Sequence, residues 1–209
     1  MESEVGEEIS VLHVDDDKDF ADLTVAFLER QSERFAVETV SSAGDGLERL
    51  EAAEFDCVIS DHEMPGRNGV EFLEVVRERY PDLPFILFTG KGSEEVASEA
   101  ISAGVSDYLQ KDVGNEKYEL LANRIQTHVE RTRVRRDLEE REAHLANAQE
   151  MANLGSWEAD VLDDRLEWSE EGSGIYGVSG EVMGYESFPE SVHPADRDRD
   201  DEAWRAALE

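Results

Sequence analysis

The N-terminal half of the chain alternates between short apolar runs and longer segments whose apolar residues recur every three or four positions. Short runs predict buried strands, and the longer segments predict amphipathic helices. We expect strands at residues 9–14, 35–40, 55–60, 84–89 and 107–110, and helices after residue 17, at 44–53, 70–80 and 94–103, and from 117 onward. Strands separated by helices of about a dozen residues indicate right-handed crossovers between parallel strands. The expected fold class is α/β, a doubly wound, five-stranded parallel sheet.

Polar side chains stand where several of these strands end. Asp15 and Asp16 follow the first predicted strand, Asp61 follows the third, Thr89 ends the fourth and Lys111 follows the fifth. In open α/β sheets, ligands bind in the crevice beyond the carboxyl ends of the strands. We therefore expect these side chains to face one crevice.

Three adjacent carboxylates, Asp15, Asp16 and Asp17, repel one another strongly. Such a run is stabilised either at a helix N-terminus, where the helix dipole favours negative charge, or around a bound cation. The three residues alone leave both interpretations open. Asp17, and Asp112 further along, are expected to be solvated loop residues.

The order of these motifs resembles the CheY-like receiver domain of two-component response regulators, from about residue 8 to residue 125. The resemblance rests on the acidic pair, on Asp-x-x-Met-Pro-Gly beginning at Asp61, on Thr-Gly at Thr89, and on Tyr-x-x-Lys from Tyr108 to Lys111. It implies that Asp61 accepts a phosphoryl group from a histidine kinase or a phosphotransfer protein. The implied function is phosphorelay signal transduction by a protein that is not otherwise an enzyme, with self-catalysed phosphoryl acceptance and slow hydrolysis as its only catalytic steps.

The resemblance also implies a Mg²⁺ site. The carboxylates of Asp16 and Asp61 and the backbone carbonyl of Glu63 would be its ligands. Asp15 would orient a water molecule or Asp16 without binding the ion itself. Lys111 would pair with the Asp61 carboxylate and then with the phosphoryl group.

A switch is implied as well. The Thr89 hydroxyl would bind a phosphoryl oxygen, and its inward movement would open space for Tyr108. One feature departs from the family, which usually has a cis proline after the lysine. Here Asp112 follows Lys111, and we expect a trans bond and a rearranged loop, because a cis bond to a residue other than proline costs about 3 kcal/mol.

Two alternatives to a separate receiver protein follow from the same residues. The chain could be the N-terminal portion of a hybrid sensor histidine kinase, or a haloacid-dehalogenase-like phosphohydrolase with its nucleophile in the run that starts at Asp15. Lys18 stands where the hydrolase family has Thr or Val, and no acidic pair follows Lys111. A receiver-like domain that only binds partners is disfavoured, because each implied site residue is present.

Residues 115–150 have nearly balanced charges and no Pro or Gly, which predicts a long helix with many ion pairs, and we expect its part at 126–146 to be a linker. Leu138, Leu145 and Ala152 recur every seven residues, with Leu121, Ile125 and Val134 upstream. This weak coiled-coil seam could pair two copies of the chain. The alternative is a single solvated connector helix.

Residues 147–209 resemble the beginning of a PAS sensor domain. A helix is expected to lead into a strand that holds Trp157, a hairpin turn at Asp163 and Asp164, and a second strand at 166–169. The later strands of a PAS sheet are missing, so this lobe is partial and could also pair two chains. Trp157, Trp168 and Tyr176 are expected to be core aromatics rather than a cofactor cage.

Acidic residues dominate the composition, with 52 Asp and Glu against 20 Lys and Arg and a formal net charge of −32. Such a field repels phosphate backbones, so we expect no nucleic-acid partner. The spread of charge suggests a surface adapted to a high-salt cytoplasm, and the arrangement is similar to that of halophilic archaeal receiver/PAS proteins. No apolar run approaches the ~18 residues of a membrane span, and residues 1–8 form an acidic tail. We expect a soluble, cytoplasmic protein without a membrane partner.

Three further residues are expected to be structural. Cys57 is the only cysteine, which excludes an internal disulfide bond, and its place in a strand predicts a small buried apolar residue. His13 and His62 flank the predicted crevice but match no metal-binding spacing.

Overall fold

The computed structural model describes residues 7–90, 94–111, 114–152, 154–160, 163, 165–176, 193–197 and 199. Its internal contacts divide the chain into two units, with the boundary between Asp137 and Leu138. Each unit is described by itself below. No helix in the described ranges combines the length and apolar character needed to cross a bilayer.

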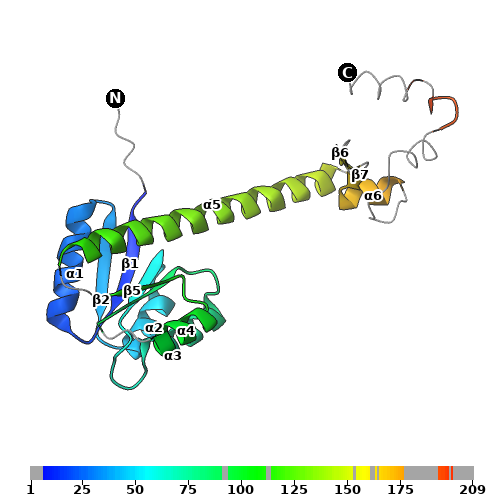
Figure 1. The fold of residues 1–209 in the computed structure, drawn as a ribbon. Coiled ribbons are helices and arrows are strands. Elements are labelled where there is room, and N and C mark those ends of the chain that lie inside the picture. The colour runs from blue at the N-terminus through cyan, green and yellow to red at the C-terminus, as the bar shows by residue number, and fades with distance from the viewer. Residues whose placement is uncertain are drawn as a thin grey trace, which may run out of the picture. The chain divides into compact units, whose positions relative to one another are not determined.

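The first unit is built on a five-stranded sheet with the order β2-β1-β3-β4-β5, in which every neighbouring pair is parallel (Figure 1). The strands are β1 (Ile9–Val14), β2 (Phe35–Val40), β3 (Cys57–Ser60), β4 (Phe85–Thr89) and β5 (Asp107–Gln110). The helices are α1 (Lys18–Gln31), α2 (Ala43–Ala52), α3 (Gly69–Arg79), α4 (Glu94–Ser102) and α5 (Glu116–Ala152). The predicted five-stranded parallel α/β fold is confirmed, with boundaries that differ by no more than two residues.

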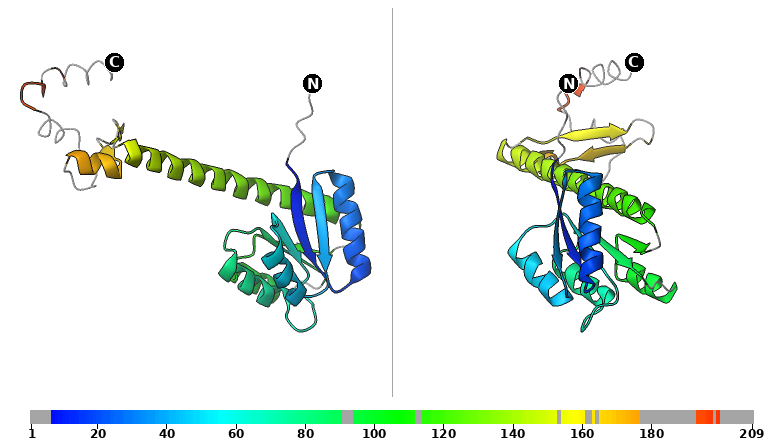
Figure 2. Two further views of the ribbon diagram at one scale, coloured as in Figure 1. Left: turned by 180° about the vertical axis from the view of Figure 1, so that it is seen from behind. Right: turned by 90° about the vertical axis from the view of Figure 1, so that its left-hand side faces the viewer.

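The sheet has helices on both faces (Figure 2) and separates two apolar clusters, one on each face. Ile9 and Val11 of β1 belong to the cluster formed with α1 and α5, whereas Leu12 and Val14 belong to the cluster formed with α2, α3 and α4. Successive side chains of a strand point to opposite faces, so this alternation follows from the backbone. Cys57 is fully buried in the first cluster, as predicted.

Helices α1 and α3 begin at polar side chains that cap them. Asp17 is exposed and precedes α1, as predicted, and its side chain also accepts the backbone N–H of Phe20 at 3.1 Å as the N-cap of α1. Asn68 and Glu71 form a reciprocal capping box at the start of α3. These caps stabilise the first turns of the helices that follow the carboxyl ends of β1 and β3.

Helix α5 is continuous from Glu116 to Ala152, across the boundary between the units. Leu121 and Ile125 are fully buried in the core of the first unit, so they are not part of a coiled-coil seam. Val134, Leu138 and Leu145 are 69%, 54% and 59% exposed, respectively. An apolar seam is therefore limited to the part of α5 that begins at Val134.

The second unit contains the end of α5, the antiparallel strands β6 (Trp157–Asp160) and β7 (Arg165–Trp168), and α6 (Glu170–Tyr176). The hairpin has the predicted order, and Trp157 pairs in register with Trp168. Trp157 is 46% exposed, so its prediction as a core residue is wrong. Asp164 and the side chain of Tyr176 lie outside the described residues.

Candidate functional site

Three carboxylates meet at the carboxyl ends of β1 and β3. The carboxylate oxygens of Asp15, Asp16 and Asp61 all lie within 4.8 Å of one another. β1 and β3 are neighbours with Val14 opposite Ser60, so the residues that follow them emerge side by side. The backbone N–H of Asp61 also donates to the Val14 carbonyl at 2.8 Å, which holds the two strand ends together. The predicted convergence of these residues is confirmed.

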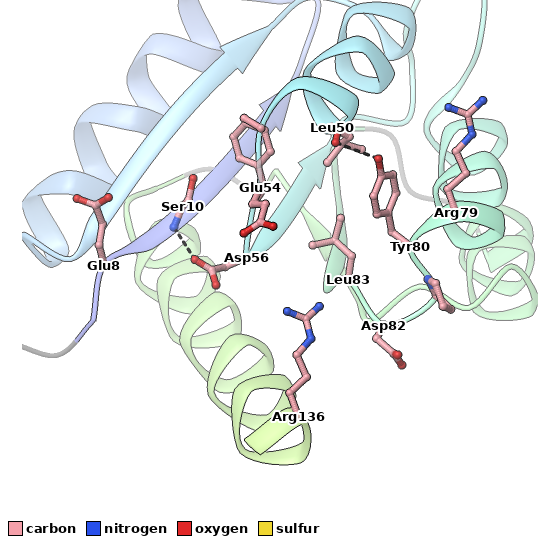
Figure 3. Close-up of a pocket in the computed structure, with 13 residues that line it drawn as sticks. Glu8, Ser10, Leu50, Glu54, Asp56, Arg79, Tyr80, Asp82, Leu83 and Arg136 are labelled. Atoms are coloured by element: carbon pink, nitrogen blue, oxygen red, sulfur yellow. Dashed lines mark hydrogen bonds between the residues drawn. The ribbon is translucent and has the colours of Figure 1, made fainter. Parts of the chain in front are cut away.

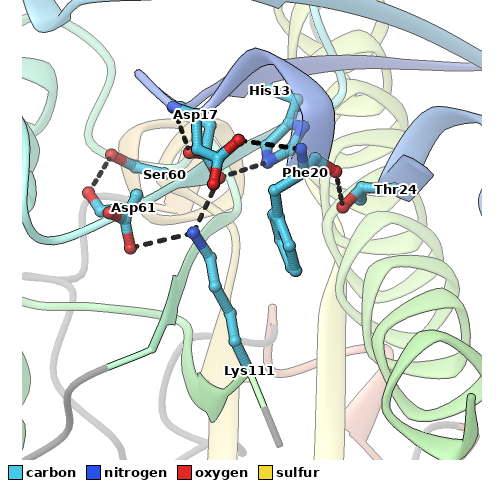
Figure 4. Close-up of polar contacts among 8 residues, drawn as sticks. His13, Asp17, Phe20, Thr24, Ser60, Asp61 and Lys111 are labelled. Atoms are coloured by element: carbon cyan, nitrogen blue, oxygen red, sulfur yellow. Dashed lines mark hydrogen bonds and ion pairs between the residues drawn. The ribbon is translucent and has the colours of Figure 1, made fainter. Parts of the chain in front are cut away.

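Lys111 reaches this cluster from the end of β5. Its Nζ lies 2.7 Å from Oδ2 of Asp15 and 3.2 Å from Oδ1 of Asp61 (Figure 4). The same ammonium lies 4.2 Å from the centre of the Phe20 ring, close enough for a cation–π contact. Lys111 thus bridges two carboxylates that would otherwise repel each other. The residue that follows, Asp112, lies outside the described residues, and so does the expected trans bond.

The carboxylate of Asp15 is buried and held from several sides. Its Oδ1 accepts the backbone N–H of Asp17 at 3.0 Å, and its Oδ2 lies 3.5 Å from Nε2 of His13. Burial raises the pKa of Asp15, but the contacts with His13 and Lys111 outweigh burial and bring the pKa below its ordinary value of 3.8. Asp15 is therefore a charged anchor for Lys111 at neutral pH.

Asp16 and Asp61 differ in their access to solvent. Asp61 is only 6% exposed, whereas Asp16 is exposed at the mouth of the crevice. Glu63 is also exposed and lies in the turn that follows Asp61. A set of oxygen donors with one buried and one solvent-facing carboxylate suits a hard cation that keeps some of its water ligands.

A tight turn after β3 fixes the backbone of Asp61. The Ser60 hydroxyl donates to the Asp61 carbonyl at 2.8 Å, and the backbone N–H of Gly69 donates to the His62 carbonyl at 3.0 Å. A Cβ atom on Gly69 would lie 2.2 Å from the Asp61 carbonyl oxygen and 2.7 Å from Cδ1 of Leu87. Only glycine allows α3 to start this close to the site.

Thr89 and Tyr108 lie on the sheet face that α2, α3 and α4 cover. Thr89 is fully buried at the end of β4, and Tyr108 packs against the apolar cluster of that face. Tyr108 pairs in register with Leu87, two residues before Thr89 on the same face of β4. Burial raises the pKa of the Tyr108 hydroxyl. The two residues implied as a switch are thus on one face of adjacent strands.

His13 was expected to flank the site as a structural residue, but its contact with Asp15 was not predicted. It is fully buried, and its side chain contacts Asp15 within the site (Figure 4). Alternation along β1 puts Val11, His13 and the following Asp15 on one face, so the strand pattern contained this information.

A separate cavity of about 560 Å³ lies near the amino ends of the strands (Figure 3). Its lining includes Ser10, Asp56, Tyr80 and Arg136. The Asp56 carboxylate accepts the Ser10 N–H at 2.9 Å, and the Tyr80 hydroxyl donates to the Leu50 carbonyl at 2.9 Å. These polar groups serve structural contacts, so the acidic crevice is the stronger candidate for chemistry.

Residues 11–123, more than half of the chain, match the family model described as response regulator receiver domain. A putative NtrX-like response regulator of Rickettsia bellii is 34% identical over 118 residues, which are 56% of this chain and 24% of that protein. The photosynthetic apparatus regulatory protein RegA of Cereibacter sphaeroides is 33% identical over 121 residues, 57% of this chain and 65% of that protein. The chain thus spans less than two thirds of the length of either relative.

The fold is similar to that of a crystallised CheY-like response regulator receiver domain protein from Methanospirillum hungatei. The TM-score is 0.56 and the sequence identity 29%, and the match covers 62% of this chain and 99% of that one. The likeness is therefore to a complete receiver domain.

Proposed function

The chain belongs to the family of response regulator receiver domains, and on this basis we propose that it acts in two-component phosphorelay signalling with Asp61 as the phosphoryl acceptor. The donor would be a histidine kinase or a phosphotransfer protein. The observation that carries the proposal is the bridge from Lys111 Nζ to Asp15 at 2.7 Å and to Asp61 at 3.2 Å. A cation beside the acceptor carboxylate can neutralise the charge that a phosphoryl group brings.

In the proposed reaction, an Asp61 carboxylate oxygen attacks the phosphorus atom of a phosphohistidine. The phosphorus–nitrogen bond breaks, an acyl phosphate forms on Asp61, and the donor imidazole leaves. Lys111 would follow the developing negative charge from the carboxylate to the phosphoryl oxygens. Slow hydrolysis of the acyl phosphate would return the domain to its starting state, and no other enzymatic activity is proposed.

The donor set of the crevice fits Mg²⁺. Asp16 and Asp61 would bind it through carboxylates and Glu63 through its backbone carbonyl, while Asp15 would orient a water molecule or Asp16. The carboxylate oxygens lie within 4.8 Å of one another, a spacing that one small cation can bridge. Bound Mg²⁺ supplies positive charge that lets the anionic phosphoryl group approach the carboxylate.

Thr89 and Tyr108 would report phosphorylation at the surface. In this proposal the Thr89 hydroxyl binds a phosphoryl oxygen, and the backbone N–H of Gly90 is a second donor. Their shared sheet face supports a coupled movement, in which Tyr108 packs into the space that Thr89 leaves. The surface formed by α4, β5 and α5 would then change its shape.

The proposed organisation is an acidic tail at 1–8, a receiver at 9–125, a linker helix at 126–146 and a partial PAS domain at 147–209. The β6–β7 hairpin and the continuous α5 support the last two assignments. Val134, Leu138 and Leu145 are exposed and could pair two copies of the chain, as could the PAS lobe. The net charge of −32 supports a cytoplasmic, halophilic setting without a nucleic-acid or membrane partner.

Two alternatives use the same residues. The chain could be the N-terminal portion of a hybrid sensor histidine kinase, in which the same receiver chemistry serves a larger protein. It could also be a phosphohydrolase of the haloacid dehalogenase type that uses Asp15 as its nucleophile. The contacts of Asp15 argue against a role as the nucleophile of a hydrolase, because Asp15 is only 2% exposed and both of its carboxylate oxygens have partners.

The test is phosphorylation with acetyl phosphate and Mg²⁺, followed by mass-spectrometric mapping of the acyl phosphate. We expect the label on Asp61, and Asp61→Asn is the matched control that should remain unlabelled. Label on Asp15 with rapid turnover would favour the hydrolase and overturn the receiver proposal. An unlabelled wild-type chain would indicate a domain that only binds partners.

A further inference from the structure

His13 is a polar residue in a place where the sheet otherwise buries apolar side chains. Its exposed fraction is 0%, and Ile9 and Val11 precede it on the same face of β1. Neither of its ring nitrogens has a hydrogen-bond partner among the described residues. A buried imidazole of this kind is less favourable than an aliphatic side chain unless it serves another purpose.

The neighbour of His13 in the site is Asp15, whose Oδ2 lies 3.5 Å from Nε2. This distance is too long for a good hydrogen bond but allows one after a small movement of the carboxylate. The same oxygen accepts Lys111 Nζ at 2.7 Å, so the lysine draws it away from the imidazole. His13 and Lys111 therefore approach one carboxylate oxygen from two sides.

The two side chains that approach Asp15 Oδ2 differ in how far they can move. Lys111 also contacts Asp61 at 3.2 Å, on a long side chain that can swing toward an added anionic group. The His13 side chain is fully buried beneath the sheet, so it cannot turn away from the site. When Lys111 turns toward Asp61, His13 becomes the side chain that can hold Asp15 Oδ2 in place.

We infer that His13 is a positioning residue for the cation site, which orients the Asp15 carboxylate from the buried side and so keeps it directed at Mg²⁺ or its water ligands. The inference rests on the proposed function, because it assumes that the acidic crevice binds Mg²⁺. Groups that orient the residues of a metal site typically change metal affinity about 10-fold to 100-fold when they are removed.

The test is isothermal titration of Mg²⁺ into the full chain, with the melting temperature measured for each variant. His13→Leu and His13→Met remove the ring nitrogens and keep an apolar side chain. We expect Mg²⁺ affinity to fall about tenfold or more in both. The melting temperature of each metal-free variant shows whether the fold is retained. His13→Gln places an amide nitrogen near the position of Nε2 and should retain affinity within about threefold.

Val11→Ala is the matched control, because Val11 lies on the same face of β1 and is fully buried but is not a site residue. It should lower the melting temperature and leave Mg²⁺ affinity unchanged. Unchanged affinity in His13→Leu and His13→Met would overturn the inference. Equal loss in Val11→Ala, or loss in His13→Gln as large as in His13→Leu, would also overturn it, since packing or ring shape would then explain the effect.

The Mg²⁺ titration also separates this inference from the proposed function. A wild-type chain that binds no Mg²⁺ would overturn both. Mg²⁺ binding that depends on Asp61 but ignores His13→Leu would overturn the inference alone. Asp61→Asn is therefore included as the variant that reports the site itself.

Discussion

Arg133 of α5 holds the Asp56 carboxylate through two nitrogens, with Nε 3.2 Å and Nη2 2.9 Å from Oδ1. The other oxygen of Asp56 accepts the Ser10 N–H at 2.9 Å, and Nη2 of Arg133 also donates to the Glu8 carbonyl at 2.7 Å. Arg133 thereby ties the linker helix to the amino ends of β1 and β3, at the opposite end of these strands from the acidic crevice. This contact fixes the last turns of α5 that belong to the first unit.

Replacing Arg133 with Met should destabilise the first unit by about 1 kcal/mol, because a partly exposed ion pair is lost while the apolar stem remains. Hydrogen exchange near residues 130–137 should accelerate. Urea unfolding of Arg133→Met, Asp56→Asn and the double variant would measure the coupling. Arg131→Met is the matched control on an exposed position of the same helix. Additive effects of the two single variants would show that the pair contributes nothing.

Gly69→Ala should destabilise the protein by at least about 2 kcal/mol, since its Cβ would lie 2.2 Å from the Asp61 carbonyl oxygen and backbone must move. The shift should also slow acetyl phosphate labelling of Asp61. Gly44→Ala is the control, because its Cβ would meet Ser42 Oγ at an ordinary 3.7 Å and glycine is unfavourable within a helix. Thermal unfolding measures both variants. Equal stability of Gly69→Ala and wild type would contradict the close approach.

Asp15 should make stability depend on pH in the acid range. Its folded-state pKa is lowered, so its contribution is present above the ordinary value of 3.8 and is lost as pH falls through the folded-state pKa. The stability difference between wild type and Asp15→Asn should therefore shrink below about pH 4. Melting temperatures of both proteins between pH 7 and pH 3 test this. A constant difference across the range is the contrary result.

Thr89→Ala should allow phosphorylation but weaken the response at Tyr108, because the hydroxyl that would bind the phosphoryl oxygen is gone. The readout is the fluorescence of Tyr108→Trp after addition of beryllofluoride and Mg²⁺, with the signal of the native tryptophans subtracted. Thr89→Ser retains the hydroxyl and should respond like the wild-type residue. A full response in Thr89→Ala would show that Tyr108 responds independently of the Thr89 hydroxyl and would contradict the proposed switch.

Stability should rise with salt, because a net charge of −32 produces self-repulsion that ions screen. The melting temperature is expected to increase by several degrees between low and molar KCl. The same measurement in sorbitol at equal osmolality is the control, because sorbitol is excluded from the protein surface but does not screen charge. A fold that is equally stable in low salt would rule out the halophilic proposal.

The sheet and its crevice could be predicted because both follow from local patterns. Apolar runs that end at Asp15 and Asp61 mark strand ends, and parallel strands bring those ends to one edge. At other positions, tertiary packing gave residues an environment that the local pattern did not predict. Leu121 and Ile125 have the spacing of a helix seam, but the sheet buries them. Val134, Leu138 and Leu145 of the predicted seam are exposed.

The acidic run at residues 15–17 shows the limit of local reasoning. The residues of the run have different surroundings. Asp17 caps α1, while Asp15 and Asp16 join Asp61. Charge and spacing cannot divide these roles, because the direction of each side chain depends on where β1 ends and α1 begins.

The sequence by itself determined the order of strands and helices, the residue types at the strand ends and the family resemblance, because hydrophobic periodicity and motif spacing are local properties. Only the tertiary structure decided that Lys111 also contacts Asp15, that His13 lies against Asp15, and that Arg133 ties α5 to Asp56. These contacts join residues from separate elements. They depend on the distances that sheet register and helix packing impose, which no single segment contains.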